Sequence, residues 1–121
     1  MARTGITATT IPAITSEGYN LTDSADFTTM STGSGNGVSF AYSARTLIIL
    51  KNSTAGAADY TFVLANTSTI TAVGGSVTDP VVDVAVGKTH LVKPAEVFKQ
   101  SDGDMYIDCD VAGEILVVET T

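Results

Sequence analysis

The stretch that decides the fold is DMYIDCDVAGEILVVE, residues 104–119. In its first half every second residue is apolar, and the residues between are polar: Met105, Ile107, Cys109 and Val111 alternate with Asp104, Tyr106, Asp108 and Asp110. This alternation predicts a half-buried β-strand with one wet, acidic face. Ala112-Gly113 turns the chain, and residues 114–119 follow with apolar side chains on both faces. The stretch therefore predicts two consecutive strands.

Similar short runs precede it. Thr46 to Leu50 is nearly all apolar, as expected of a strand that is covered on both faces or central in a sheet. In residues 59–65, Tyr60, Phe62 and Leu64 share one face. In residues 81–86, the alternation predicts inward valines and an outward acid: Val82, Val84 and Val86 against Asp83.

Together these patterns predict about eight short strands. They cover residues 38–42, 46–50, 59–65, 69–73, 81–86, 89–92, 105–111 and 114–119. Only residues 93–100 suit a short helix, with Pro94 near its first position. Short strands separated by frequent turn signals are typical of a β-sandwich, a jelly roll or a small barrel.

Composition supports an all-β domain. The chain has 121 residues, enough for one domain, and it is rich in Thr and Ser. Charged residues make up 16%, against a typical fraction of about 25%. Strong helix formers are scarce, which excludes a helical bundle or coiled coil. An apolar fraction of 44% excludes a disordered chain.

The charge balance argues against two kinds of partner. The formal net charge is -7, and the six cationic residues are scattered along the chain. Binding to nucleic acid or to an anionic membrane draws on clustered cations, so neither is expected. The longest apolar run, residues 47–50, is too short to span a membrane. The polar start of the chain does not suit a signal peptide, so we expect synthesis and assembly in a cytoplasm.

The residues that could carry chemistry do not form a recognisable active site. His90 is the single candidate base, and Cys109 lies in an alternating strand, where a buried inert thiol is expected. The glycines of residues 33–37 are followed by no helix that could bind a phosphate. The acids of residues 102–110 are too far apart along a strand to converge on a cation, so a solvated face is expected. The sequence predicts no enzyme, no metal and no cofactor.

The N-terminus differs from the rest of the chain. Residues 1–16 place isoleucines among Thr and Ala, and Pro12 interrupts any strand ladder. We expect an extended arm over residues 1–16 and a β-sandwich domain over residues 17–121. The apolar residues of this arm need a partner surface, on this domain or on another chain: Ile6, Ile11, Pro12 and Ile14.

The C-terminal third carries an ordered series of motifs. They are a valine-rich strand (81–86), VGKTHLV (86–92), Pro94, VFKQ (97–100), DGDMYID (102–108) and a final valine-rich strand. The series resembles small head decoration proteins, also called capsid cement proteins, of tailed bacteriophages. The resemblance spans residues 45–119 loosely and residues 81–119 best.

This resemblance implies a fold, a partner and a location. The fold is a jelly-roll-like β-sandwich that binds the major capsid protein on the outside of an assembled phage head. Such proteins often self-associate, commonly as trimers, and an N-terminal arm often orders against the capsid. Ile6, Ile11, Pro12 and Ile14 then become the expected capsid contacts, and the virion surface becomes the expected location.

The alternative is a carbohydrate- or receptor-binding β module of a phage fibre or spike. Without tryptophan, sugar stacking would depend on four tyrosines, of which Tyr60 is expected to be buried: Tyr19, Tyr42, Tyr60 and Tyr106.

Overall fold

Two mixed, five-stranded sheets form the described part of the chain, which comprises residues 3–10, 27–53, 56–64 and 79–120 of a computed structural model. The β9 sheet consists, in spatial order, of β1 (Thr4–Gly5), β4 (Val38–Ala41), β9 (Asp104–Cys109), β6 (Ala58–Phe62) and β7 (Val81–Val84). The β10 sheet consists, in spatial order, of β2 (Thr9–Thr10), β10 (Glu114–Glu119), β5 (Thr46–Lys51) and β8 (Thr89–Val92). A further short strand, β3 (Thr28–Thr29), also pairs with β10. A 3-10 helix, η2, spans Glu96–Phe98.

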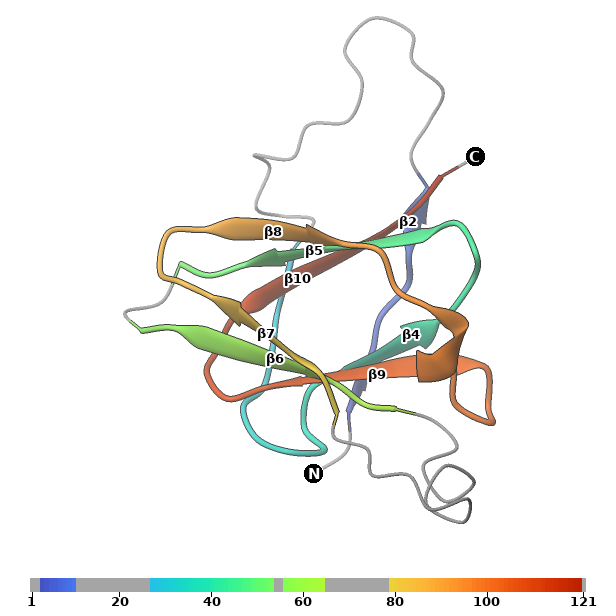
Figure 1. The fold of residues 1–121 in the computed structure, drawn as a ribbon, viewed down its shortest axis with the longest axis horizontal. Coiled ribbons are helices and arrows are strands. Elements are labelled where there is room, and N and C mark those ends of the chain that lie inside the picture. The colour runs from blue at the N-terminus through green and yellow to red at the C-terminus, as the bar shows by residue number, and fades with distance from the viewer. Residues whose placement is uncertain (1–2, 11–26, 54–55, 65–78, 121) are drawn as a thin grey trace, which may run out of the picture.

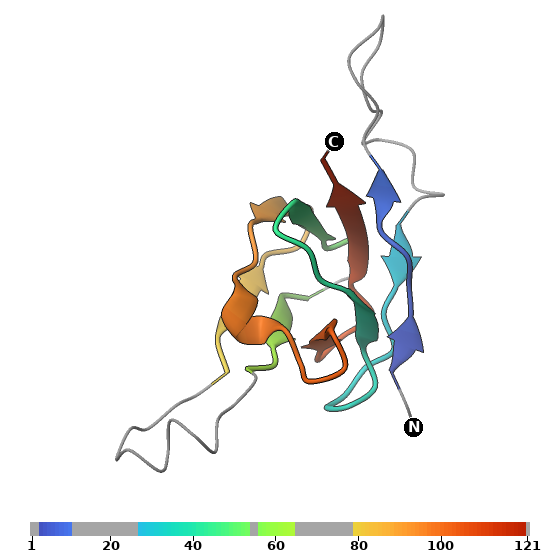
Figure 2. The same ribbon diagram turned by 90° about the vertical axis from the view of Figure 1, so that its right-hand side faces the viewer.

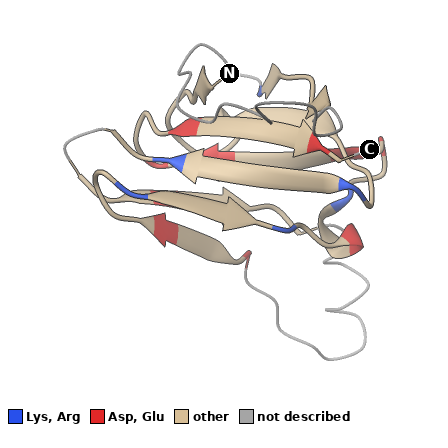
Figure 3. Cartoon of the chain, turned by 90° about the horizontal axis from the view of Figure 1, so that it is seen from above, with Lys and Arg blue, Asp and Glu red and all other residues tan. Residues whose placement is uncertain are grey.

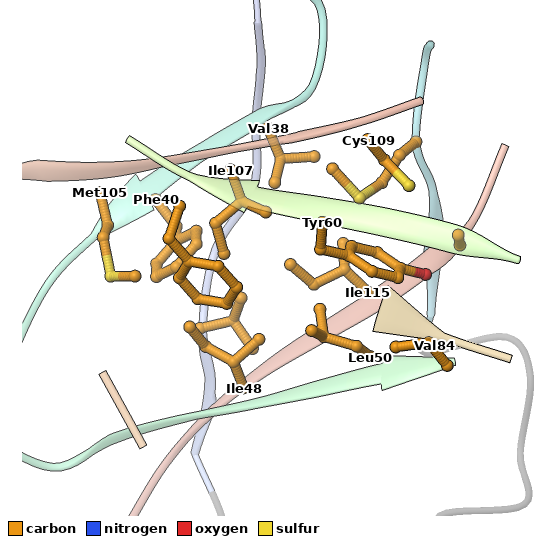
Figure 4. Packing of buried hydrophobic residues seen from close by; sticks show 14 residues of the cluster. Val38, Phe40, Ile48, Leu50, Tyr60, Val84, Met105, Ile107, Cys109 and Ile115 are labelled. Atoms are coloured by element: carbon orange, nitrogen blue, oxygen red, sulfur yellow. The ribbon is translucent and has the colours of Figure 1, made fainter. Parts of the chain in front are cut away.

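The two sheets stack face to face around one apolar core, as Figure 1 shows. Alternate residues of each strand point inward, and Figure 4 shows how they interdigitate. Tyr60 is fully buried at the centre. Its hydroxyl donates a hydrogen bond of 2.8 Å to the Lys51 carbonyl, which satisfies the polar end of the ring. The expectation of an all-β, sandwich-like domain is confirmed.

The β10 sheet is apolar on its outer face as well. Leu116 and Val118 point away from the main core and are still buried, together with Ile49 on β5. Phe27 and Leu47 pack against this second cluster. The apolar character of both faces of residues 114–119 therefore reflects burial on both faces.

The N-terminal segment closes one side of the sandwich. β1 pairs in parallel with β4, and β2 pairs in parallel with β10, so residues 3–10 connect the two sheets. Figure 2 shows this segment on the right, whereas β7, β8 and η2 lie on the opposite side. Ile6 is partly buried against the main core. The first part of the expected arm therefore lies on its own domain.

Seven of the eight predicted strands are found, as β4 to β10, and several differ in extent; β9, for example, ends at Cys109, short of the predicted residue 111. β7 ends at Val84, so the expected inward position of Val86 is wrong, and that side chain is 53% exposed in the turn that follows. β6 ends at Phe62, which leaves Leu64 outside the strand and only partly buried. The helix predicted over residues 93–100 is reduced to the single turn of η2. The strand predicted over residues 69–73 lies outside the described residues.

Candidate binding surfaces

A polar contact on the outer face of the β9 sheet joins two residues that are 105 positions apart, Arg3 and Asp108. Asp108 points outward from β9, where Arg3 meets it with two hydrogen bonds, 2.9 Å from Nε and 2.7 Å from Nη2. The backbone amides of Gly35 and Gly37 donate two more, at 3.0 and 3.1 Å. Asp108 is 6% exposed, so the expectation of a solvated carboxylate is wrong at this position. Arg3 and the glycine loop cover a side chain that the strand pattern places on the outer face.

The glycine loop has a structural role here. A side chain at Gly37 would place its Cβ 2.0 Å from the Ile107 carbonyl oxygen, so only glycine allows β4 to approach β9 this closely. Gly33 and Gly35 have positive φ angles, which lets the loop bend so that its amides face the carboxylate. Residues 33–37 thus bind an anion that belongs to the protein itself.

The environment of Asp108 stabilises its charged form. Burial alone raises the pKa of this carboxyl, but Arg3 and the amides of Gly35 and Gly37 outweigh it, and the net pKa lies below the ordinary value. The Arg3 guanidinium also stacks over the Tyr106 ring at 4.6 Å. The Tyr106 hydroxyl in turn donates to Asp102 at 2.6 Å, which lowers the pKa of Asp102.

An open, acidic hollow of about 410 Å³ lies beside this contact on the outer face of the β9 sheet. Besides Arg3 and Asp108, its charged lining consists of Asp59, Asp79 and Asp110. Partial desolvation, followed by repulsion from Asp83 and Asp110, raises the pKa of Asp59. Across the described ranges, no group of three or more acidic, His or Cys side chains is arranged to hold a metal ion.

Cys109 and His90, the residues considered as nucleophile and base, lie in different environments, one buried and one exposed. Cys109 is buried in the main core, and this burial raises the pKa of its thiol, in line with the expected inert cysteine. His90 lies exposed on β8, opposite Leu50 of β5 in the register.

The structure describes only some of the residues expected to bind a partner. Ile6 packs into the chain's own core, whereas Ile11, Pro12 and Ile14 lie outside the described residues. Most of the tyrosines proposed for sugar stacking have rings that are buried or in contact with other residues of the chain. Tyr60 is buried, Tyr42 packs partly against the core, Arg3 covers Tyr106, and Tyr19 is outside the described ranges.

A second, apolar hollow of about 140 Å³ was not foreseen from the sequence. Its lining includes residues of both sheets, among them Val82 of β7 and Val92 of β8. The rings of Phe62 and Phe98 meet edge to face at 5.9 Å and complete the wall. The remaining lining residues are Pro80, Lys93 and Pro94. Only the stacking of the two sheets brings these residues together, because β7 and β8 belong to different sheets, so no local pattern signals the hollow.

Comparison with known proteins adds no relative. No known protein family, no curated protein and no solved structure matches the chain. Within the part of the chain that the structure covers, no helix has the length and apolarity needed to cross a membrane.

Proposed function

We propose that this chain is a structural protein that decorates the outer surface of a bacteriophage head and stabilises the assembled shell. The observation that carries the proposal is the motif series of residues 81–119, which resembles head decoration proteins. In the structure these residues form β7, β8, η2, β9 and β10. The same proposal includes a jelly-roll-like relation between the two sheets and a location on the virion. It also includes self-association of the decorating copies, with the trimer that the resemblance implies.

Stabilisation of a shell needs no chemistry beyond binding. A protein that binds the assembled lattice and not the loose subunits shifts the equilibrium toward the lattice. Many identical copies on one shell add a multivalent contribution. The major capsid protein is therefore the proposed partner.

Part of the expected arm is already used within the domain. Residues 3–10 pair with β4 and β10 and supply the Arg3 contact, so removal of the whole arm would damage the domain itself. The proposed capsid contacts are therefore the apolar residues after Thr10, namely Ile11, Pro12 and Ile14. Ile6 is assigned to the core instead.

Co-sedimentation with shells tests the proposal. The probe is a DNA-free, expanded head assembled from the major capsid protein of the phage whose genome encodes this chain. We expect the wild-type chain to pellet with these shells and to raise the temperature at which they dissociate. A double variant, Ile11→Ser with Ile14→Ser, should bind more weakly, while the neighbouring Thr15→Ala control should bind like the wild type.

Failure of the wild-type chain to bind such shells would overturn the proposal. Binding to an array of glycans in place of shells would favour the alternative, a carbohydrate- or receptor-binding module. Equal binding by the double variant and the wild type would remove the arm from the proposal and leave the decoration role standing.

A further inference from the structure

β7 and β8 leave two sheet edges on the same side of the molecule. β7 is the last strand of the β9 sheet and β8 the last of the β10 sheet, and both lie on the left in Figure 2. Among the described strands, none pairs with the outer edge of either. Exposed edges of this kind are where further strands add to a sheet.

The hydrogen-bonding register shows which backbone groups point outward. The Phe62 amide donates to the Pro80 carbonyl, and the Asn52 amide donates to the Lys88 carbonyl. Because antiparallel pairs alternate along a ladder, every second residue then turns its N–H and C=O away from its partner strand. These residues are Val81 and Asp83 on β7 and Thr89 and Leu91 on β8.

The two edges carry opposite charge. Residues 79–84 contain Asp79 and Asp83 and no cation, whereas residues 88–93 contain Lys88 and Lys93 and no carboxylate. The Lys93 ammonium donates to the Ala44 and Thr46 carbonyls of its own chain, so Lys88 is the cation left for a partner at this edge. Figure 3 shows the separation, with red on β7 and blue at each end of β8. The charge pattern of β8 therefore fits the charge pattern of β7, although the two strands belong to different sheets of one molecule.

Apolar surface accompanies both edges. Val81 is 53% exposed, Val86 in the connecting turn is 53% exposed, and Leu91 is 68% exposed. The apolar hollow lies between the edges, with Val82 and Val92 on its walls. A protein that covers this side would bury apolar side chains as well as pair the backbone groups.

We propose that this side of the molecule binds a second copy of the same chain, with β8 of one copy pairing with β7 of the next. The occupant is a second copy because this chain itself carries the acidic edge that fits the basic one. Each copy has both edges on one side, so a small closed assembly can satisfy all of them. The inference identifies the surface through which the self-association of the proposed function would occur. It rests on the proposed function in this respect alone.

Charge reversal tests the contact. Lys88 and Asp83 are exposed, so substitution of either should leave the fold intact. The molar mass of the purified chain is measured by light scattering over a wide range of concentrations, with circular dichroism as the check on folding. We expect the wild-type chain to be a multimer that Lys88→Asp and Asp83→Lys each weaken, on the order of tenfold or more in dissociation constant. The variant with both substitutions should recover much of the association.

Arg45→Asp is the matched control, since Arg45 is an exposed cation outside both edges and should not change the mass. Three results would overturn the inference: a wild-type chain that stays monomeric throughout, an equal loss with Arg45→Asp, or no recovery in the combined variant. These measurements contain no shells. A monomeric chain that still binds shells therefore overturns this inference and the self-association in the proposed function, and leaves the decoration role standing. A multimer that binds no shells overturns the decoration role alone.

Discussion

Replacement of Arg3 with alanine removes the guanidinium that holds Asp108 and leaves its carboxylate with two of its four hydrogen bonds. The remaining partners are the amides of Gly35 and Gly37. The carboxylate stays in the same enclosed position, where an unpaired charge is costly. The variant also loses the stacking of Arg3 on Tyr106.

The expected cost follows from how enclosed the pair is. Removal of one partner from a fully buried ion pair destabilises a protein by about 3–5 kcal/mol. Here the side chains of Arg3 and Asp108 are 22% and 9% exposed, and two amides still compensate the carboxylate. We therefore expect the free energy of unfolding to fall by about 2–3 kcal/mol.

Urea unfolding at neutral pH, followed by circular dichroism, measures this loss. Arg45→Ala is the control, because this exposed arginine should change stability by no more than about 0.5 kcal/mol. A loss below about 1 kcal/mol for Arg3→Ala would place the contact among ordinary surface ion pairs and refute the reasoning. A double-mutant cycle with Asp108→Asn then separates the pair energy from the effects of each substitution alone.

Three further predictions concern single residues. Because the folded pKa of Asp108 lies below its ordinary value, this group contributes stability that is present above about pH 4 and lost as the pH falls through the folded pKa. Urea midpoints across the acidic range should therefore fall less steeply for Asp108→Asn than for the wild type. Gly37→Ala forces a Cβ toward the Ile107 carbonyl and should cost at least about 2 kcal/mol in the same unfolding assay. Cys109, buried and with a raised thiol pKa, should react with an aromatic disulfide reagent only after urea is added.

Each of these has a clear contrary result. Parallel acid profiles for Asp108→Asn and the wild type would mean that another group dominates acid unfolding. Gly5→Ala is the control for Gly37→Ala, since a Cβ at Gly5 meets nothing within 4 Å, and equal losses would contradict the close approach. Rapid labelling of the native chain by the thiol reagent would show that the core opens around Cys109.

The strands were predictable because their signal is local. Alternation over a few residues places Phe40, Tyr60 and Ile107 inward whatever the rest of the chain does, and all three are buried. The exposure of Val86 shows the limit of this signal, because the alternation of residues 81–86 outlasts the strand that uses it.

The binding surfaces were less predictable because they depend on distant segments. The pattern of β9 assigns Asp108 to the outer face correctly, but it cannot show that Arg3 covers that position. The apolar hollow likewise needs β7 and β8 to end their sheets on the same side. Two-residue parallel pairings such as β1 with β4 leave no periodic trace in a sequence at all.

The parallel pairing of the N-terminal segment sets an order of events during synthesis. Arg3 and Asp108 are 105 positions apart, and β2 pairs with β10, the last strand described. Residues 3–10 must therefore wait until β9 and β10 have been synthesised before their native neighbours exist. Such long sequence separations slow folding, because the entropy of closing large loops is lost before any contact compensates it. The sandwich should consequently complete its folding only after β10 has been synthesised, with residues 3–10 among the last parts to join.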